Sequence, residues 1–384
     1  MKIAFVSQLD ARDVRSWSGL PYYMSRSLED STHRVVHLSP LEEKWAALHK
    51  AKQLVYRVIT RRRHLRDREP LILEGYARQV EERLSPDIDL VFSASTIPIA
   101  RLRCEQPIVF WTDAAFAGMV DFYPSFSNLT DGSRQAGDAM ERAALDRCAL
   151  AIYSSAWAAE TAIEHYGARP EKVRVVPFGA NLESTPTADT IDGIVASRPD
   201  DRCRLLFIGV EWRRKGGDVA VEVARLLNDA GLDTTLTISG PPSGTVPNLP
   251  FVRDLGFVSK NSPSGRRRIE AALAESHFLI LPSRADCTPV VLCEANAFGV
   301  PCLTTNVGGI PTIVRDGENG QTFAVEAAPD DYCSYILDVF SDGDRYRCLA
   351  MSSFREYRLR LNWTNSGNIV KRLLEEVGAG SGWR

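Results

Sequence analysis

The chain has 384 residues, 44% of them hydrophobic and 25% charged, which is typical of a soluble globular protein long enough for two domains. The formal net charge of −3 and pI near 6.1 argue against nucleic acid as a partner, because binding by charge needs a basic surface. The eight cysteines form no C-x-x-C pair and lie beside no histidine cluster, so we expect reduced thiols, a cytoplasmic protein and no metal site.

The N-terminal segment predicts a strand that opens a domain directly. Neither the basic start nor the long apolar run of a signal peptide occurs in MKIAFVSQLD, and no apolar run approaches the ~20 residues of a membrane span. Gly19 follows this strand. A glycine there lets the backbone approach a ligand closely, because open α/β sheets bind ligands at the carboxyl ends of their strands. A turn that simply needs a glycine is the alternative.

Residues 44–66 are expected to contain a basic helix. Its cations include Lys44, Lys50, Lys52 and Arg57, and apolar residues recur among them at roughly helical spacing: Trp45, Leu48, Val55, Val58 and Ile59. Such a helix can lie on an anionic membrane surface. The alternative is a helix that packs on the protein through its apolar side and turns its charged side to solvent.

Two more strands are expected at residues 89–93 and 107–111. Asp87-Ile88-Asp89 matches an Asp-x-Asp metal motif, but it precedes a strand rather than following one, so we expect no metal there. Asp113 follows the second strand and is a candidate site residue, with an ordinary cap at the strand end as the alternative.

A linker is expected at residues 185–201, which are rich in Asp, Thr, Pro and Ser. It would divide the chain into an N-terminal domain of residues 1–184 and a C-terminal domain of residues 185–365. Strand and helix patterns alternate in both halves, which is typical of α/β folds with parallel sheets.

The C-terminal domain opens with a strand at residues 204–209 and a loop that carries Arg213, Arg214, Lys215 and two glycines. Three cations and two glycines between a strand and a helix N-terminus are well suited to clamp a diphosphate. A solvated run of charges is the alternative.

Two acidic residues flank a later strand-to-helix connection. Asp286 follows a buried strand at residues 278–281, and Glu294 lies on a helix expected from about Thr288 to Phe298. The helix N-terminus between them offers amides to a phosphate. Pro289 has no N–H, so the donors there would be Thr288, Val290 and Val291. A plain strand-loop-helix unit with surface carboxylates is the alternative.

These motifs together resemble the retaining nucleotide-sugar glycosyltransferases of family 4, which have the GT-B architecture. That family's signature is an acidic residue, seven others and a second acidic residue, then small residues and Gly-x-Pro. Here it stands as Asp286, Glu294 and Gly299-Val300-Pro301. Three further pairs occur in the family's order and spacing: Lys215-Gly216, Gly308-Gly309 and Asn319-Gly320.

The resemblance implies two Rossmann-like α/β domains that face each other across a cleft, with a C-terminal helix, 366–384, packed back on the first domain. The chain departs from the family's pattern at four places. The family more often has Glu at position 286 and Phe-Gly at 288–289. It commonly has a histidine at position 112 and an arginine at position 210, where this chain has Thr112 and Val210.

The resemblance also implies the function. The chain would be a retaining glycosyltransferase that moves a sugar from a nucleoside-diphosphate sugar to a hydroxyl of a glycan, a lipid-linked saccharide or a small molecule. It would need no cofactor and no metal. It would be cytoplasmic, with possible contact through 44–66 to the inner face of the membrane, as basic helices of the first domain often make in the family.

Each site residue takes a role in this hypothesis. Lys215, with Arg213 or Arg214, would neutralise the diphosphate. Glu294 would bind the ribose hydroxyls, and Asp286 would hold the transferred sugar. The backbone from Thr288 to Val291 would add donors. Asp113 would be a catalytic residue together with Asp286, and Gly19 would bind substrate in a loop that resembles the family's sugar and acceptor loop.

Two other functions are compatible with the same architecture. A nucleotide-sugar epimerase would need an acid–base pair in place of an open acceptor site. A catalytically silent binding protein would keep the fold and bind the donor without consuming it. The departures at Thr112 and Val210 give weight to the second of these.

Overall fold

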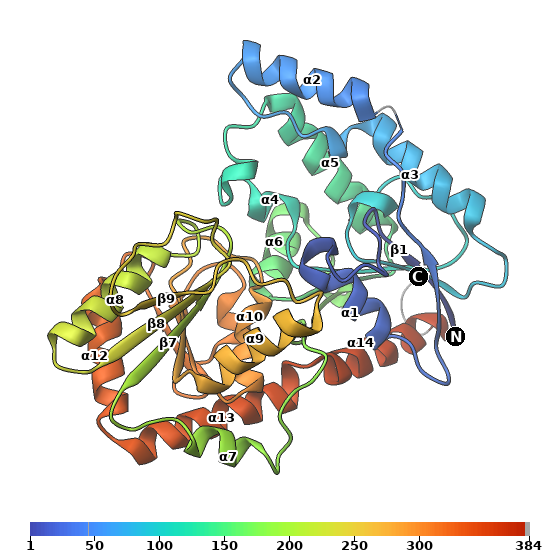
Figure 1. The fold of residues 1–384 in the computed structure, drawn as a ribbon. Helices are drawn as coiled ribbons and strands as arrows, with labels where there is room; N and C mark the ends of the chain where they lie inside the picture. Colours follow the sequence, from blue (N-terminus) through green and yellow to red (C-terminus); the bar gives the residue numbers. More distant parts are fainter. Residues whose placement is uncertain (45, 381–384) are drawn as a thin grey trace. The chain divides into compact units, whose positions relative to one another are not determined.

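The computed structural model describes residues 1–44 and 46–380, which form two compact α/β units (Figure 1). Unit 1 contains Met1–Pro177 and the C-terminal residues from Ser366, and unit 2 contains Phe178–Asn365. The division falls at Pro177 rather than near residue 185. Phe178 belongs to unit 2, where its ring stacks on Trp363 with 5.7 Å between ring centroids.

Unit 1 is built on a six-stranded parallel sheet in the order β2-β1-β3-β4-β5-β6. Each residue of β3, β4 and β5 is buried, as expected for strands with helices on both faces. The strands are β1 (Lys2–Val6), β2 (Arg34–Leu38), β3 (Leu90–Ser93), β4 (Ile108–Thr112), β5 (Leu150–Tyr153) and β6 (Val173–Val175).

The helices of unit 1 are α1 (Leu20–Ser27), α2 (Ala46–Ile59), α3 (Pro70–Arg83), α4 (Phe116–Met119), α5 (Asp131–Arg147) and α6 (Ala156–Tyr166). Short 3-10 turns connect them: η1 (Ser16–Gly19), η2 (Arg66–Arg68), η3 (Ile97–Ile99), η4 (Pro124–Phe126) and η5 (Pro170–Lys172). Thr130 and Ser155 cap the N-termini of α5 and α6, since their side chains accept hydrogen bonds from the first-turn amides.

The chain returns to unit 1 through α14 (Trp363–Gly378). Lys371 pairs with Asp30 at 2.7 Å, and Gly367 lies so close to the Ser27 carbonyl that a Cβ would stand 2.4 Å from its oxygen. These contacts hold the C-terminal helix on the unit that contains the N-terminus. The last residues of the predicted helix, 381–384, lie outside the described part of the chain.

Unit 2 repeats the architecture with a parallel sheet in the order β12-β11-β10-β7-β8-β9. Its strands are β7 (Cys203–Ile208), β8 (Thr234–Ser239), β9 (Val252–Asp254), β10 (Phe278–Leu281), β11 (Cys302–Thr305) and β12 (Gly320–Phe323). Its helices are α7 (Ile191–Ala196), α8 (Gly217–Asp229), α9 (Pro263–Glu275), α10 (Val290–Ala297), α11 (Ile310–Ile313), α12 (Pro329–Phe340) and α13 (Gly343–Arg360).

Two predicted boundaries in unit 2 are corrected by the structure. Helix α10 begins at Val290 rather than near Thr288, because Pro289 takes an extended conformation with ψ of 97° and becomes the N-cap. Helix α7 occupies Ile191–Ala196, inside the stretch predicted as a linker. Its Ile191 and Val195 are buried, so this stretch packs as part of unit 2 despite its polar composition.

One close backbone contact fixes the loops at the carboxyl edge of this second sheet. Gly216, with φ of 76°, is the N-cap of α8, and a Cβ built on it would stand 2.1 Å from the Pro282 carbonyl oxygen just after β10. The β7–α8 and β10–α10 connections therefore touch backbone to backbone, which only glycine permits.

Gly216→Ala tests that contact, with Gly231→Ala as its matched control. Both glycines have positive φ, but a Cβ on Gly231 meets nothing within 4 Å, so the control carries the left-handed strain of ~1–2 kcal/mol without a clash. We expect Gly216→Ala to lower the free energy of unfolding in denaturant titrations clearly more than Gly231→Ala does. Equal losses from the two variants would show that the close contact contributes nothing.

Candidate functional site

The β7–α8 connection carries the predicted cations to the carboxyl edge of the second sheet. Strand β7 lies in the middle of that sheet between β10 and β8. Its connection to α8 is compact, because Gly217 packs under the Trp212 ring, where a Cβ would stand 2.2 Å from the ring. Lys215 and Arg214 are thereby held with their side chains largely covered, each 13% exposed.

Asp286 is the point at which these cations converge. The Lys215 ammonium donates to Asp286 Oδ2, Arg214 Nη1 lies 3.5 Å from the same oxygen, and Ser283 Oγ donates to it at 3.3 Å. Arg214 also donates to the Ala285 carbonyl at 2.7 Å. Within residues 1–44 and 46–380, the side-chain contacts given for Asp286 all reach Oδ2, so Oδ1 is available to accept from a ligand hydroxyl.

The structure distinguishes the two neighbouring arginines. Arg214 lies against Asp286, whereas the Arg213 side chain is exposed and its carbonyl accepts from Arg284. Arg284 in turn forms a two-bond pair with Asp218 on α8, both bonds at 2.9 Å. These links join the β7–α8 loop to the β10–α10 loop. Of Arg213 and Arg214, only Arg214 reaches the Asp286 carboxylate.

Glu294 is buried in α10, with 2% of its side chain exposed. Its partner was not identified from the sequence. The Lys260 ammonium donates to Glu294 Oε1, from the loop between β9 and α9. Lys260 lies 34 residues before Glu294, and no local pattern links the two. The only sequence signal is indirect, since a carboxylate inside a largely apolar helix requires a cation or donors somewhere in the fold.

The N-terminus of α10 lies between the two carboxylates in the sequence. Pro289 is the N-cap and supplies no N–H, while Thr288 is buried beside it. Val290 and Val291 occupy the first two helical positions, whose amides have no acceptor inside an α-helix. These two amides are therefore the donors that the helix N-terminus can offer to a phosphate.

Gly19 and Asp113 lie at the carboxyl edge of the sheet of unit 1. Gly19 has φ of 88° and is the N-cap of α1, and a Cβ there would stand 3.2 Å from the Val14 carbonyl oxygen. Asp113 follows β4 and is half-buried. Strand β3 separates β4 from β1, so the two residues follow strands that are not neighbours.

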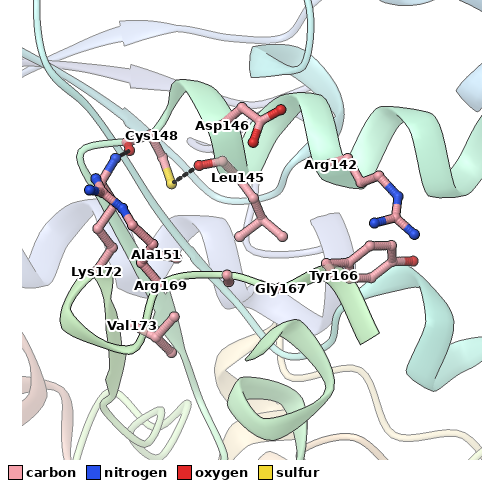
Figure 2. Close-up of a pocket in the computed structure, with 11 residues that line it drawn as sticks. Arg142, Leu145, Asp146, Cys148, Ala151, Tyr166, Gly167, Arg169, Lys172 and Val173 are labelled. Atoms are coloured by element: carbon pink, nitrogen blue, oxygen red, sulfur yellow. Dashed lines mark hydrogen bonds between the residues drawn. The ribbon is translucent and has the colours of Figure 1, made fainter. Parts of the chain in front are cut away.

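Unit 1 also contains a cavity of about 270 Å³, and Figure 2 shows the residues that line it. Its walls come from α5, the end of α6, η5 and the starts of β5 and β6, which is the amino edge of the sheet. Burial raises the pKa of the Cys148 thiol in its wall to about 12, so this cysteine is unreactive near neutral pH. Because the cavity lies at the amino edge of the sheet, it is separate from the carboxyl edge, where parallel α/β sheets bind ligands.

The predicted basic helix is present as α2, at the periphery of unit 1 in Figure 1. Four of its apolar side chains are largely exposed: Leu54, Val55, Val58 and Ile59 are 52–75% accessible. The helix therefore does not pack on the protein through these residues. Trp45 lies outside the described residues, as does the side chain of Leu48. No helix in the described part of the chain is long and apolar enough to cross a membrane.

Two glycosyltransferase family models match the chain. The model described as "Glycosyltransferase Family 4" matches residues 21–184, and the model described as "Glycosyl transferases group 1" matches residues 202–342. The two matches cover most of unit 1 and the core of unit 2, and the second includes Lys215, Asp286 and Glu294.

Curated relatives with similar sequences carry the name D-inositol 3-phosphate glycosyltransferase. The protein of Acidothermus cellulolyticus is 33% identical over 206 residues, which is 49% of this chain and 44% of the relative. That of Catenulispora acidiphila is 30% identical over 253 residues, or 62% of this chain and 58% of the relative. The matches thus span about half the length of the curated relatives.

Solved structures with the same fold match over nearly the full chain. HepE from Anabaena, solved with UDP-glucose, aligns with a TM-score of 0.63 at 15% identity over 98% of this chain and 100% of its own. Sucrose-phosphate synthase from Thermosynechococcus elongatus aligns with a TM-score of 0.68 at 14% identity over 99% of both chains. With its two parallel six-stranded sheets and its two family matches, the chain belongs to the GT-B glycosyltransferases, with a family 4 region followed by a group 1 region.

Proposed function

We propose that the protein is a retaining glycosyltransferase that moves a sugar from a nucleoside-diphosphate sugar to a hydroxyl of an acceptor. The observation that carries the proposal is the cluster around Asp286, where Lys215 and Arg214 meet a buried carboxylate beside a helix N-terminus. Charges of both signs at one edge of a parallel sheet match a ligand that has hydroxyls at its ends and a diphosphate in its middle.

Lys215 and Arg214 neutralise the diphosphate in this mechanism. As the bond between the sugar and the diphosphate breaks, negative charge develops on the leaving oxygen, and fixed cations stabilise it. A lysine ammonium has three N–H donors. Lys215 can therefore keep its bond to Asp286 and still donate to phosphate oxygens, and the amides of Val290 and Val291 add two further donors.

Asp286 and Glu294 bind the two ends of the donor. Glu294 accepts from the ribose hydroxyls, and Asp286 accepts from hydroxyls of the transferred sugar through Oδ1. Asp286 is one methylene shorter than Glu, but Lys215, Arg214 and Ser283 fix its position, and its backbone carbonyl accepts from the Gly309 amide at 3.3 Å. That fixed position makes the shorter side chain a defined ligand for one hydroxyl pattern.

The stereochemistry and the metal requirement belong to the same proposal. We propose that the acceptor attacks on the face from which the diphosphate leaves, so that the anomeric configuration is retained and the departing phosphate takes the acceptor's proton. The cations of the cluster supply the positive charge that a metal would otherwise supply. Transfer is therefore expected to be metal-independent and to need no cofactor.

The acceptor is assigned by class. The curated relatives are named for D-inositol 3-phosphate, a small polyol phosphate, so this compound is the first small-molecule acceptor to test. A structural neighbour named lipopolysaccharide outer core galactosyltransferase, 15% identical, points to glycan and lipid-linked acceptors as the other classes. We propose a cytoplasmic enzyme that reaches such acceptors at the inner face of the membrane.

Nucleotide binding tests the donor cluster directly. We expect UDP, GDP or ADP to raise the melting temperature, because a ligand that binds the native state stabilises it by mass action. Lys215→Met should weaken binding of that nucleotide by about tenfold to a hundredfold, the range for a lost charge-assisted hydrogen bond. Arg213→Met is the matched control, because it removes a neighbouring exposed cation from the same loop. Equal losses from the two variants would contradict the assignment.

The transfer reaction is tested by proton NMR of the product. With the donor whose nucleotide binds and with inositol 3-phosphate or a lipid-linked saccharide as acceptor, the new bond should have the anomeric configuration of the donor. The rate should be unchanged by EDTA. An inverted product, or a rate abolished by EDTA and restored by a divalent cation, contradicts the mechanism. A changed nucleotide sugar formed without acceptor indicates an epimerase instead.

We further propose that α2 lies on an anionic membrane surface. Its exposed apolar residues accompany cations on α2 and on the loop that follows it, including Lys50, Arg57 and Arg63. Apolar side chains enter the interface while cations meet the lipid phosphates, so both contribute to binding.

Vesicle sedimentation tests the membrane contact. The protein should bind phosphatidylcholine vesicles that contain phosphatidylglycerol and should bind pure phosphatidylcholine weakly. The double variant Val58→Asp and Ile59→Asp should reduce binding about tenfold or more, because it removes apolar area and adds negative charge. Leu359→Asp is the control, because it alters an exposed leucine, 64% accessible, on α13 of unit 2. Unchanged binding by the α2 variant would exclude this helix as the contact.

A further inference from the structure

Unit 2 contains two lysines, and each of them binds one carboxylate of the candidate site. Lys215 contacts Asp286 and Lys260 contacts Glu294, whereas the other permanently charged cations of this unit are arginines. A lysine ammonium is a compact point charge with three donors, which suits a contact with one oxygen of a carboxylate better than a planar guanidinium does. The second pair is not explained by the diphosphate clamp.

The loop that carries Lys260 is held rigidly by its neighbours. A Cβ built on Gly265 would stand 1.9 Å from the Ser259 carbonyl oxygen, so the first turn of α9 packs directly against the loop. Arg266 Nη1 donates to the Lys260 carbonyl at 3.2 Å, and Ser262 caps α9 by accepting from the Gly265 amide at 3.1 Å. The base of the Lys260 side chain is therefore fixed relative to α9.

Lys260 is the residue that orients the buried carboxylate of Glu294. A carboxylate as buried as Glu294 is costly to leave ionised without a partner. In the part of the chain that the structure describes, the hydrogen bond given for its side chain comes from Lys260 and reaches Oε1. An ionised carboxylate has about four acceptor positions, so Oε2 can still accept from a ligand. The Lys260 side chain itself is one-third exposed.

We propose that Lys260 is a positioning residue for the donor's ribose. By holding Oε1 of Glu294, it fixes the orientation of the carboxylate and turns Oε2 toward the ribose hydroxyls, so the enzyme discriminates ribonucleotides from nucleotides that lack those hydroxyls. This inference rests on the proposed nucleotide-sugar site, and it assigns the discrimination to a pair of residues rather than to Glu294 alone.

The test compares two ligands on a small set of variants. Dissociation constants are measured by calorimetry for the nucleoside diphosphate that binds the native protein, chosen among UDP, GDP and ADP, and for its 2′,3′-dideoxy analogue. The variants are Lys260→Met, Lys260→Arg, Glu294→Gln and the double variant Lys260→Met with Glu294→Gln. Arg267→Met is the matched control, because it removes an exposed cation from the adjoining first turns of α9.

We expect Lys260→Met to weaken binding of the ribonucleotide by about tenfold, the effect of a lost hydrogen bond to a charged group, and to leave the dideoxy analogue nearly unchanged. Adding Glu294→Gln should then produce little further loss, because the two residues act through one contact. Lys260→Arg should keep part of the discrimination. Arg267→Met should change neither ligand, and a melting temperature near the native value should accompany each variant.

Other outcomes of these binding measurements would contradict the proposed role of Lys260. Equal weakening of both ligands by Lys260→Met shows that Lys260 acts on the phosphates or on the fold, not on the ribose. Unchanged binding of the ribonucleotide shows that Glu294 needs no positioning. Additive losses in the double variant show that the residues act independently. If no nucleoside diphosphate binds the native protein, the proposed function fails first, and the inference fails with it.

Discussion

The candidate site depends on the pairing of one buried carboxylate, Asp286, with cationic side chains. Asp286 is 5% exposed, and it meets Lys215 and Arg214 from a different strand-to-helix connection. A carboxylate buried this far is costly unless cations pair with it. The pairing therefore joins the β7–α8 loop to the β10–α10 loop, and Gly216 allows their backbones to touch. Because these loops belong to two neighbouring strands of one parallel sheet, their ligand-binding groups converge at its carboxyl edge.

The charges of the site are matched to a diphosphate. Three cations, Lys215, Arg214 and Lys260, face two carboxylates, Asp286 and Glu294, which leaves one net positive charge among the five. The N-termini of α8 and α10 add partial positive charge at the same edge. The site can thus attract an anion, and in the unliganded site the cations do not repel one another strongly because the two carboxylates offset most of their charge. Each carboxylate keeps an oxygen for hydroxyl groups. Under the proposed function, the same residues serve stability in the free protein and recognition in the complex.

Much of this arrangement could be predicted from the sequence, because it depends on local patterns. Apolar runs indicate the buried strands, and the eight-residue step from Asp286 to Glu294 places both at one strand-to-helix connection. Long-range contacts could not be predicted. The ring of Phe178 stacks on Trp363 far along the chain, and Lys260 reaches Glu294 from another loop. The choice between Arg213 and Arg214 depends on side-chain direction, which the spacing of neighbouring residues does not determine.

The most direct measurement of the central claim is a crystal structure of the protein with a nucleoside diphosphate. We expect the diphosphate to lie within hydrogen-bond distance of the Lys215 ammonium and the amides of Val290 and Val291. The ribose hydroxyls should donate to Glu294, with Asp286 left for the sugar. A nucleotide bound elsewhere, such as in the cavity lined by Arg142, Arg169 and Lys172 of unit 1, would contradict the account.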